Sequence, residues 1–269
     1  MSSQEYRQEL ANFLRTRRER ISPADVGLPI GRRRRTRGLR REEVAVLAGL
    51  SPTWYTYLEQ ARNIHPSPEV LDSLARVLAL SEDERRYLHQ LAAGNAPAVS
   101  AEGVEPDMSL ITALVRHAGR GPYPVYALNH AGDVIAWNDA ATRWYTDWGA
   151  RDGLDRNMLW WMLTSEEARE RVVDWADDAR DITARSRAMA ARHPGDRKVT
   201  HVINHLLEAS PEFRRWWADF EVRGQQARPR RLRHPAFGEL TTQLAVVHPT
   251  DGSLVTIAFH LPYSDDHRD

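Results

Sequence analysis

The chain has 269 residues, with 37 basic and 37 acidic side chains, 42% hydrophobic residues and nine tryptophans. This length and this apolar content suffice for two domains of ordinary size, which excludes global disorder. The absence of cysteine excludes disulfides, thiol catalysis and thiolate metal sites, and no apolar run approaches the roughly 18 residues that cross a bilayer. We therefore expect a cytoplasmic protein without membrane contact.

The first 94 residues carry the pattern of a helical domain. The expected helices span residues 4–21, 40–48, 52–59, 67–80 and 81–94. Leu10, Phe13 and Leu14 form one apolar stripe on the first of them, which should pack on the helices that follow. We predict a five-helix domain over residues 1–94, followed by a linker at residues 95–106 whose small residues and prolines favour no regular structure.

Residues 41–60, REEVAVLAGLSPTWYTYLEQ, match the helix-turn-helix unit at the positions where that unit is restrictive. Two short helices that cross steeply need small residues where they touch, and Ala45 and Ala48 provide them. Gly49 supplies the turn, which requires a residue that tolerates positive φ. Ser51 stands at the N-cap and is followed by proline at the first helical position. We therefore expect the second helix to lie in the major groove of DNA.

An arginine cluster precedes the second helix of the helix-turn-helix, residues 52–59. Eleven arginines stand between residues 15 and 41, against two acids, although the chain has no net charge. Such a concentration is typical of phosphate binding, although arginine runs also occur as solvated tails. On the second helix, Thr53 and Thr56 are candidates for reading bases, and so are Trp54 and Tyr57, with packing in a protein interface as the alternative for the two aromatics. The expected DNA contacts are Arg33, Arg34, Arg35, Arg40, Arg41, Ser51, Thr53, Trp54, Thr56 and Tyr57.

From residue 107 onward the pattern mixes helices and strands. PVYALNHAGDVIAWN contains two short β-type runs around a turn, which is typical of a hairpin. Helices are expected at residues 108–118, 140–148, 165–191, 199–209 and 210–220, and β-type runs return between residues 238 and 262. Strands at both ends predict an α+β domain over residues 107–269, in which N-terminal and C-terminal strands close a small antiparallel sheet.

Aromatic side chains are dense in this second domain, which holds eight of the nine tryptophans. Most should lie in the core, but a cavity lined by aromatics and a few convergent polar groups is a typical ligand site. Each polar candidate also has a structural alternative: helix capping for Asn138, an ion pair for Arg156 and a turn for His234. The expected ligand-binding residues are Tyr126, Trp137, Asn138, Arg156, Asn157, Trp216 and His234.

No catalytic or metal-binding motif stands out. His201 and His205 share a helix face at the spacing of two zinc ligands, but the glutamate of a zincin motif and a third ligand are missing. The sequence shows no glycine-rich phosphate loop, nucleophile elbow or serine-histidine-aspartate order. We therefore expect no enzyme activity, no metal site and no cofactor.

Several motifs in a common order carry a resemblance to a known family. RTRGLRREEVAVLAGLSPTWYTYLEQAR and PSPEVLDSLARVLAL are followed by AWN, RN, WADDAR, SPEFRRWW and HPAFGEL. Together they resemble the bacterial XRE-type regulators that carry an MmyB-like ligand-binding domain, from about residue 6 to 262. The resemblance implies a PAS-like sensory domain, dimerisation and, in some relatives, an apolar or lipid-like ligand.

This chain departs from that pattern at two places. Arg37 stands where relatives often have proline, and the tandem Trp160 and Trp161 stands where aliphatic residues or phenylalanine are expected. The tandem tryptophans mean that the shape of a relative's pocket does not carry over to this chain.

The sequence thus predicts a transcription regulator that binds double-stranded DNA as a homodimer, because one half-site read by one short helix discriminates too little in a genome. Its second domain is expected to sense a small apolar or fatty-acid-like molecule. Three alternatives stay open: a second domain that only dimerises or binds a protein partner, an enzyme with an appended DNA-binding domain, and an adaptor that binds no DNA.

Overall fold

A computed structural model describes residues 3–29, 38–93, 105–118, 121–193, 196–222, 229–249 and 253–263. The chain divides into two compact units, the first built mainly on residues 1–98 and the second mainly on residues 99–269. Most of the expected linker, residues 95–104, lies outside the described residues, as do the expected phosphate contacts Arg33, Arg34 and Arg35. In the described ranges, no helix is both long enough and apolar enough to cross a membrane.

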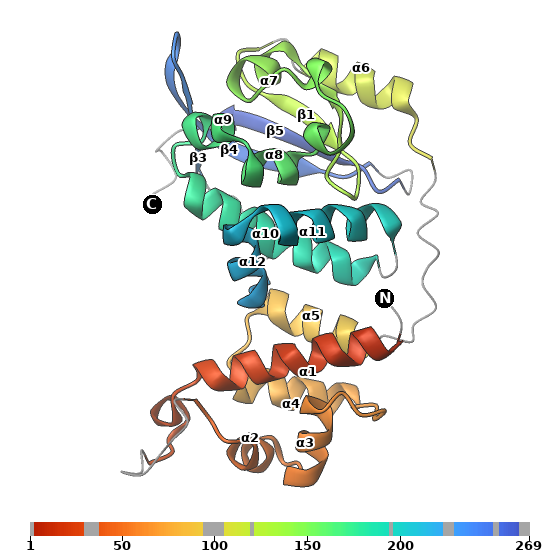
Figure 1. Cartoon of the computed structure of the whole chain (residues 1–269), viewed down its shortest axis with the longest axis vertical. Helices are drawn as coiled ribbons and strands as arrows, with labels where there is room; N and C mark the ends of the chain where they lie inside the picture. Colours follow the sequence, from red (N-terminus) through yellow and green to blue (C-terminus); the bar gives the residue numbers. More distant parts are fainter. Residues whose placement is uncertain are drawn as a thin grey trace. The chain divides into compact units, whose positions relative to one another are not determined.

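The described residues of the first unit form helices (Figure 1). The elements are α1 (Ser3–Arg20), the 3-10 helix η1 (Pro23–Val26), α2 (Arg41–Ala48), α3 (Pro52–Glu59), α4 (Pro68–Val77) and α5 (Glu82–Ala92). Leu10, Phe13 and Leu14 are buried, and Phe13 meets Tyr87 of α5 edge to face with ring centroids 5.2 Å apart. The predicted apolar stripe of α1 is confirmed.

In the described residues, the second unit is built on a five-stranded antiparallel sheet. Its strands are β1 (Val125–Leu128), β2 (Val134–Trp137), β3 (Pro229–His234), β4 (Gly238–Val247) and β5 (Thr256–Pro262), in the order β2-β1-β5-β4-β3. β1 pairs with both β2 and β5, and Val125 lies opposite Phe259. A strand from the start of the domain therefore lies beside one from its end, and the predicted α+β class of this domain is confirmed.

Helices pack on both faces of the sheet (Figure 1). α6 (Met108–Ala118) packs against β1 and β2, with Ile111 and Val115 buried. The opposite face carries a larger helical layer, in which Trp148, Trp161 and Phe213 are buried almost completely. That layer comprises α7 (Asp139–Trp144), η2 (Trp148–Ala150), η3 (Gly153–Arg156), α8 (Met158–Thr164), α9 (Glu166–Arg171), α10 (Trp175–Arg192), α11 (Arg197–Ala209) and α12 (Pro211–Ala218).

Several elements differ from the sequence-based expectation. The helix expected at residues 165–191 is two helices, α9 and α10, because Val172 leaves the helical path to pair with Leu232 of β3. The helix expected at residues 140–148 ends at Trp144. The sequence pattern indicates neither β3 nor α8, since PRRLRH carries three arginines and MLWWMLT is almost wholly apolar.

Candidate DNA-binding helix and ligand cavity

The α2–turn–α3 unit has the local geometry of a helix-turn-helix. Gly49 ends α2 in the left-handed region with a φ of 71°, which other residues rarely adopt. Ser51 caps α3, because its Oγ accepts a hydrogen bond from the amide of Trp54 at 3.1 Å. Ala45 and Ala48 are buried on the inner side of α2. The predicted turn and N-cap are confirmed.

A buried ion network holds α3 in the first unit. The carboxylate of Glu59, the last residue of α3, accepts hydrogen bonds from Arg18 Nε at 2.5 Å, Arg18 Nη2 at 3.0 Å and Arg41 Nε at 2.6 Å. Burial by itself raises the pKa of Glu59, but the hydrogen bonds and charges of the two arginines outweigh it and lower the pKa. Burial and the neighbouring Glu59 carboxylate raise the pKa of Tyr55 well above its usual value. The network therefore stays charged at neutral pH and fixes α3 to α1 and α2.

The polar residues expected to contact DNA differ in their exposure and in the bonds that they already form within the protein. Arg40 and Thr53 are exposed. Arg41 is about half exposed, yet its guanidinium binds the buried carboxylate at the end of α3, so it also holds that helix. The Thr56 hydroxyl donates to the carbonyl of Pro52 at 2.8 Å. Thr53 is thus the exposed threonine on α3, and Thr56 uses its proton within the helix.

The two aromatic candidates, Trp54 and Tyr57, are partly buried. The guanidinium of Arg62 lies over the ring of Tyr57, 4.2 Å from its centroid, and its Nε donates to Gln60 Oε1 at 3.1 Å. Sequence reasoning does not single out Arg62. The signal that could have found it is its position in the QAR segment, three residues after the end of α3. This stack places a positive charge beside a candidate groove-facing ring.

The second unit contains a small cavity of about 60 Å³ between the sheet and its helical layer. Side chains of a strand alternate between the two faces, and the cavity lies on the face opposite α6. Leu128, Ile182 and Leu244 form apolar walls, and Met158 and Met162 of α8 complete them. Methionine repacks readily because it is unbranched and has three rotatable bonds.

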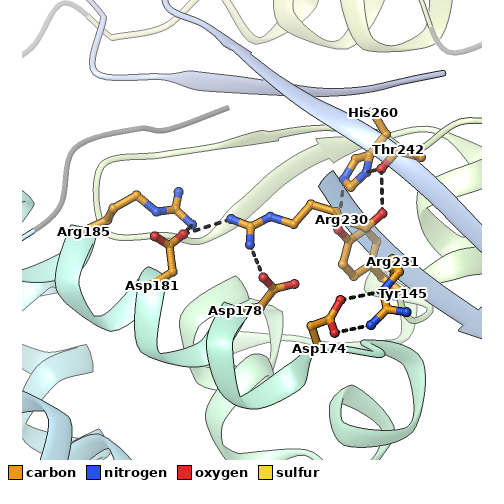
Figure 2. A network of polar contacts seen from close by, with 9 residues as sticks. All are labelled: Tyr145, Asp174, Asp178, Asp181, Arg185, Arg230, Arg231, Thr242 and His260. Atoms are coloured by element: carbon orange, nitrogen blue, oxygen red, sulfur yellow. Dashed lines mark hydrogen bonds and ion pairs between the residues drawn. The ribbon is translucent and has the colours of Figure 1, made fainter. Parts of the chain in front are cut away.

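One end of this cavity is charged (Figure 2). Arg230 of β3 is buried, and its guanidinium bridges Asp178 and Asp181 of α10, with Nη2 2.9 Å from Asp181 Oδ2. Arg185, one turn further along α10, shares Asp181 at 3.2 Å. Burial lowers the pKa of Arg185 despite Asp181, whereas burial of Arg230 is outweighed by the two aspartates, which raise its pKa. Of the two arginines, Arg185 is therefore the one whose positive charge is less fully stabilised by neighbouring aspartates.

A chain of neutral hydrogen bonds adjoins the charged end (Figure 2). His260 Nε2 lies 2.9 Å from the hydroxyl of Tyr145, and His260 Nδ1 lies 2.7 Å from Thr242 Oγ1. Burial and the positive charge of Arg230 lower the pKa of His260 to about 3, so the imidazole is neutral at physiological pH. Burial raises the pKa of Tyr145 well above its usual value. The net charges at this end of the cavity therefore reside on α10 and β3.

The lining combines apolar walls, which suit hydrocarbon, with the guanidinium groups of the buried Arg230 and the partly buried Arg185, which pair with carboxylates. A volume of about 60 Å³ corresponds to about two water molecules at roughly 30 Å³ each. A larger molecule therefore enters only when the walls move, and the methionines of α8 are the side chains best suited to repacking.

The structure brings one of the sequence-predicted ligand residues, Tyr126, into the lining of this cavity. Trp137 and Asn138 line a separate open groove beside α6. The Asn138 side chain caps α7 and also accepts a hydrogen bond from the amide of Val125, while Asn157 is fully buried and caps α8. Asn138 thus has the capping role expected as its alternative to ligand binding, and Asn157 also caps a helix.

The other three candidates are not among the residues that line the cavity. Arg156 ends η3, and Trp216 is buried with its ring centroid 6.0 Å from that of Trp175. His234 Nδ1 accepts a hydrogen bond from the amide of Ala236 and braces the turn between β3 and β4. Sequence reasoning misses the charged residues at the end of the cavity, since no local pattern marks an arginine or aspartate that becomes buried.

The histidine pair of α11 is used within its own helix. The rings of His201 and His205 lie with centroids 4.1 Å apart at an interplanar angle of 51°, and His205 Nδ1 lies 2.8 Å from the carbonyl oxygen of His201. Over the described part of the chain, no three histidine, aspartate or glutamate side chains form a group that could hold a metal ion.

Comparison with known proteins identifies both parts of the chain. The model of a helix-turn-helix domain matches residues 9–88, and the model of the MmyB-like transcription regulator ligand binding domain matches residues 112–269. No curated protein matches the chain. The first match contains α2 and α3 and the second contains the cavity, so one candidate site falls in each matched domain.

Proposed function

The chain belongs to the family of transcription regulators with an MmyB-like ligand-binding domain, and we propose that it senses an apolar molecule with an acidic head. Its two domains support a DNA-binding transcription regulator with a ligand-binding domain, and domains of this kind are typical of regulators rather than of enzymes. We propose further that it works in the cytoplasm as a homodimer of the XRE type and that its second domain is PAS-like.

The charged end of the cavity is the observation that supports an acidic ligand. Arg230 is buried there beside apolar walls, and Arg185 is partly buried, with a pKa that desolvation lowers despite its pairing with Asp181. A carboxylate placed against Arg185 forms a charge-assisted hydrogen bond in a site of low dielectric, where such bonds are strong. The hydrocarbon part of the molecule then displaces the side chains of α8 and fills the space between α8 and the sheet.

The first domain supports DNA binding through the exposed side of α3. Thr53 and Arg62 are exposed, with Arg62 lying over the partly buried ring of Tyr57, and the exposed Arg40 stands at the start of α2. We assign phosphate contact to the arginines and base contact to Thr53. Glu59 is assigned a positioning role, because it holds both α3 and the side chain of Arg41.

Decanoate and decanol test the ligand assignment, because they share a hydrocarbon chain and differ in the head group. We expect decanoate to raise the melting temperature of the full chain more than decanol and to bind about tenfold more tightly, the size of one charged hydrogen bond. Arg185→Gln should abolish this preference, since Arg230 still holds both aspartates. The matched control is Arg231→Gln, which breaks only a partly exposed pair with Asp174 and should keep the preference.

The small volume of the cavity also favours a second candidate function, in which the second domain dimerises and binds no small molecule. Under that alternative neither decanoate nor decanol shifts the melting temperature, while DNA binding by the full chain is intact. Equal shifts from both amphiphiles would instead retain an apolar ligand and remove the acidic head from the proposal.

A further inference from the structure

The sheet of the second unit is covered unevenly on the face that carries α6. α6 packs against β1 and β2, with Ile111 and Val115 buried. On the same face, β4 and β5 present Val247, 50% exposed, and Leu261, 45% exposed, with Phe259 partly buried between them. The cross-strand partners Val247 and Ile257, like Ala245 and Phe259, share this face. An apolar floor therefore lies open beside α6.

The helical periodicity of α6 shows which of its sides borders this floor. Successive residues turn by about 100°, so Thr112 and Arg116 lie on one flank of the buried stripe and Leu110 and Leu114 lie on the other. Thr112 and Arg116 line a groove with Trp137 of β2. Since β5 and β4 follow β1 on the side away from β2, Leu110 and Leu114 face the open floor. They are 50% and 43% exposed.

Leu110 and Leu114 on α6 stand beside the exposed apolar residues of β4 and β5, and together they form a step-shaped apolar surface, called the step below. Two copies of this surface can fit against each other. A helix with apolar residues on two sides is not fully covered by a single sheet, and a contiguous apolar surface of this kind marks an interaction site. When two copies meet about a two-fold axis, α6 of each can fill the floor of the other, because one surface then meets the same surface.

The charges of α6 fit the same arrangement. Glu105 and Asp107 stand at its N-terminal end, where Asp107 Oδ1 accepts hydrogen bonds from the amides of Ser109 and Leu110. At its C-terminal end, His117 lies on the flank of Leu110 and Leu114, whereas Arg116 lies on the opposite flank and lines the groove with Trp137. An antiparallel pair of these helices brings the acidic end of one copy to the basic end of the other, which is favourable for both the side chains and the helix dipoles.

We propose that this step, made of Leu110 and Leu114 on α6 and of Val247, Phe259 and Leu261 on the sheet, binds the same step on a second copy of the chain. The assignment rests on the homodimer of the proposed function and names its surface. A peptide or an unrelated protein has no need of the reciprocal charge pattern, whereas a second copy supplies both the filling helix and the opposite charges.

Sedimentation of the full chain over a range of concentrations tests the surface. We expect a dimer that Leu114→Glu and Leu261→Glu each weaken at least about 30-fold, the loss typical of a central interface residue, because each buries an unpaired carboxylate. Both positions are exposed in one copy, so the variants should retain the circular dichroism and melting behaviour of the monomer. The matched control is Phe237→Glu, at a 56% exposed apolar residue on the β3–β4 turn, which should leave the dimer intact.

Two results would overturn the assignment. If the wild-type chain stays monomeric at tens of micromolar, there is no dimer to explain. If Leu114→Glu and Leu261→Glu both dimerise as tightly as the Phe237→Glu control, the contact lies elsewhere on the chain. The DNA and amphiphile measurements on the same samples separate these outcomes from failure of the proposed function, because α3 and the cavity lie outside the substituted surface.

Discussion

Buried and exposed ion pairs on neighbouring residues of β3 should differ sharply in their effect on stability. Arg230→Ala leaves Asp178 and Asp181 buried without their shared cation, which we expect to cost about 3 to 5 kcal/mol. Arg231→Ala breaks a pair with Asp174 that is partly exposed, and should have little effect on stability, because solvent screens an exposed ion pair. Urea unfolding, followed by hydrogen exchange in β3 and α10, measures both. Equal losses of unfolding free energy in the two variants would mean that the ion pairs of Arg230 with α10 do not hold β3 in place.

The Glu59 network predicts an acid-sensitive α3. The folded-state pKa of Glu59 lies below its ordinary value of 4.5, so the stabilisation is complete above that pH and is lost as pH falls through the folded pKa. The protection of residues 41–60 against hydrogen exchange in the full chain, measured relative to the intrinsic rate at each pH, should therefore fall once the pH drops below the ordinary value of 4.5. Glu59→Gln should already have low protection at pH 7 and lose little more of it in acid. An unchanged acid profile in that variant would assign the effect to other carboxylates.

Single residues could be predicted from the sequence where their role is local. Gly49 and Ser51 are specified by the turn and the cap that they form with their immediate neighbours. Arg185, Arg230 and His260 could not be found in this way, because the surroundings of these side chains depend on strands and helices that are distant in the sequence. A charged residue in PRRLRH or WADDAR has the same local pattern whether it faces solvent or a cavity.

At the scale of elements, the sequence predicted the α+β class of the second domain and the pairing of its first and last strands, because both strands carry β-type runs bounded by turns. It did not predict the break between α9 and α10. Residues 165–191 have a continuous helical pattern, and the break at Val172 arises from its pairing with Leu232, about sixty residues later. It also missed β3, where Arg230 is paired with acids of α10 and so can be buried in a strand.

The turn between α2 and α3 gives a prediction at this scale. Gly49→Ala meets no atom within 4 Å, so its cost is that of a left-handed backbone alone, about 1 to 2 kcal/mol. Gly49→Asn should cost less, because asparagine tolerates this conformation. Hydrogen exchange of α2 and α3 in the full chain measures both. The matched control is Gly153→Ala, with a φ of 50° in the second unit, which should leave exchange in α2 and α3 unchanged.

For the whole molecule, DNA and ligand bind different domains of one chain, so any coupling between them is reciprocal. If decanoate changes the affinity of the full chain for its operator by some factor, the operator changes the affinity for decanoate by the same factor. Equal operator affinities with and without saturating decanoate would assign the second domain to dimerisation rather than to sensing.

The most direct test of the account is the selection of genomic DNA fragments by the full-length protein, followed by titration of the enriched fragment at several salt concentrations. We expect a site with two-fold symmetry, with half-sites about one helical turn apart, bound at least about 1,000-fold more tightly than unrelated DNA. Thr53→Ala should relax the preference at one or two base pairs, and Arg40→Ala should lower the salt dependence by about one counterion. Recovery of no common sequence, with an affinity for all fragments no higher than that of a neutral control protein at low salt, would contradict the assignment of this chain as a DNA-binding regulator.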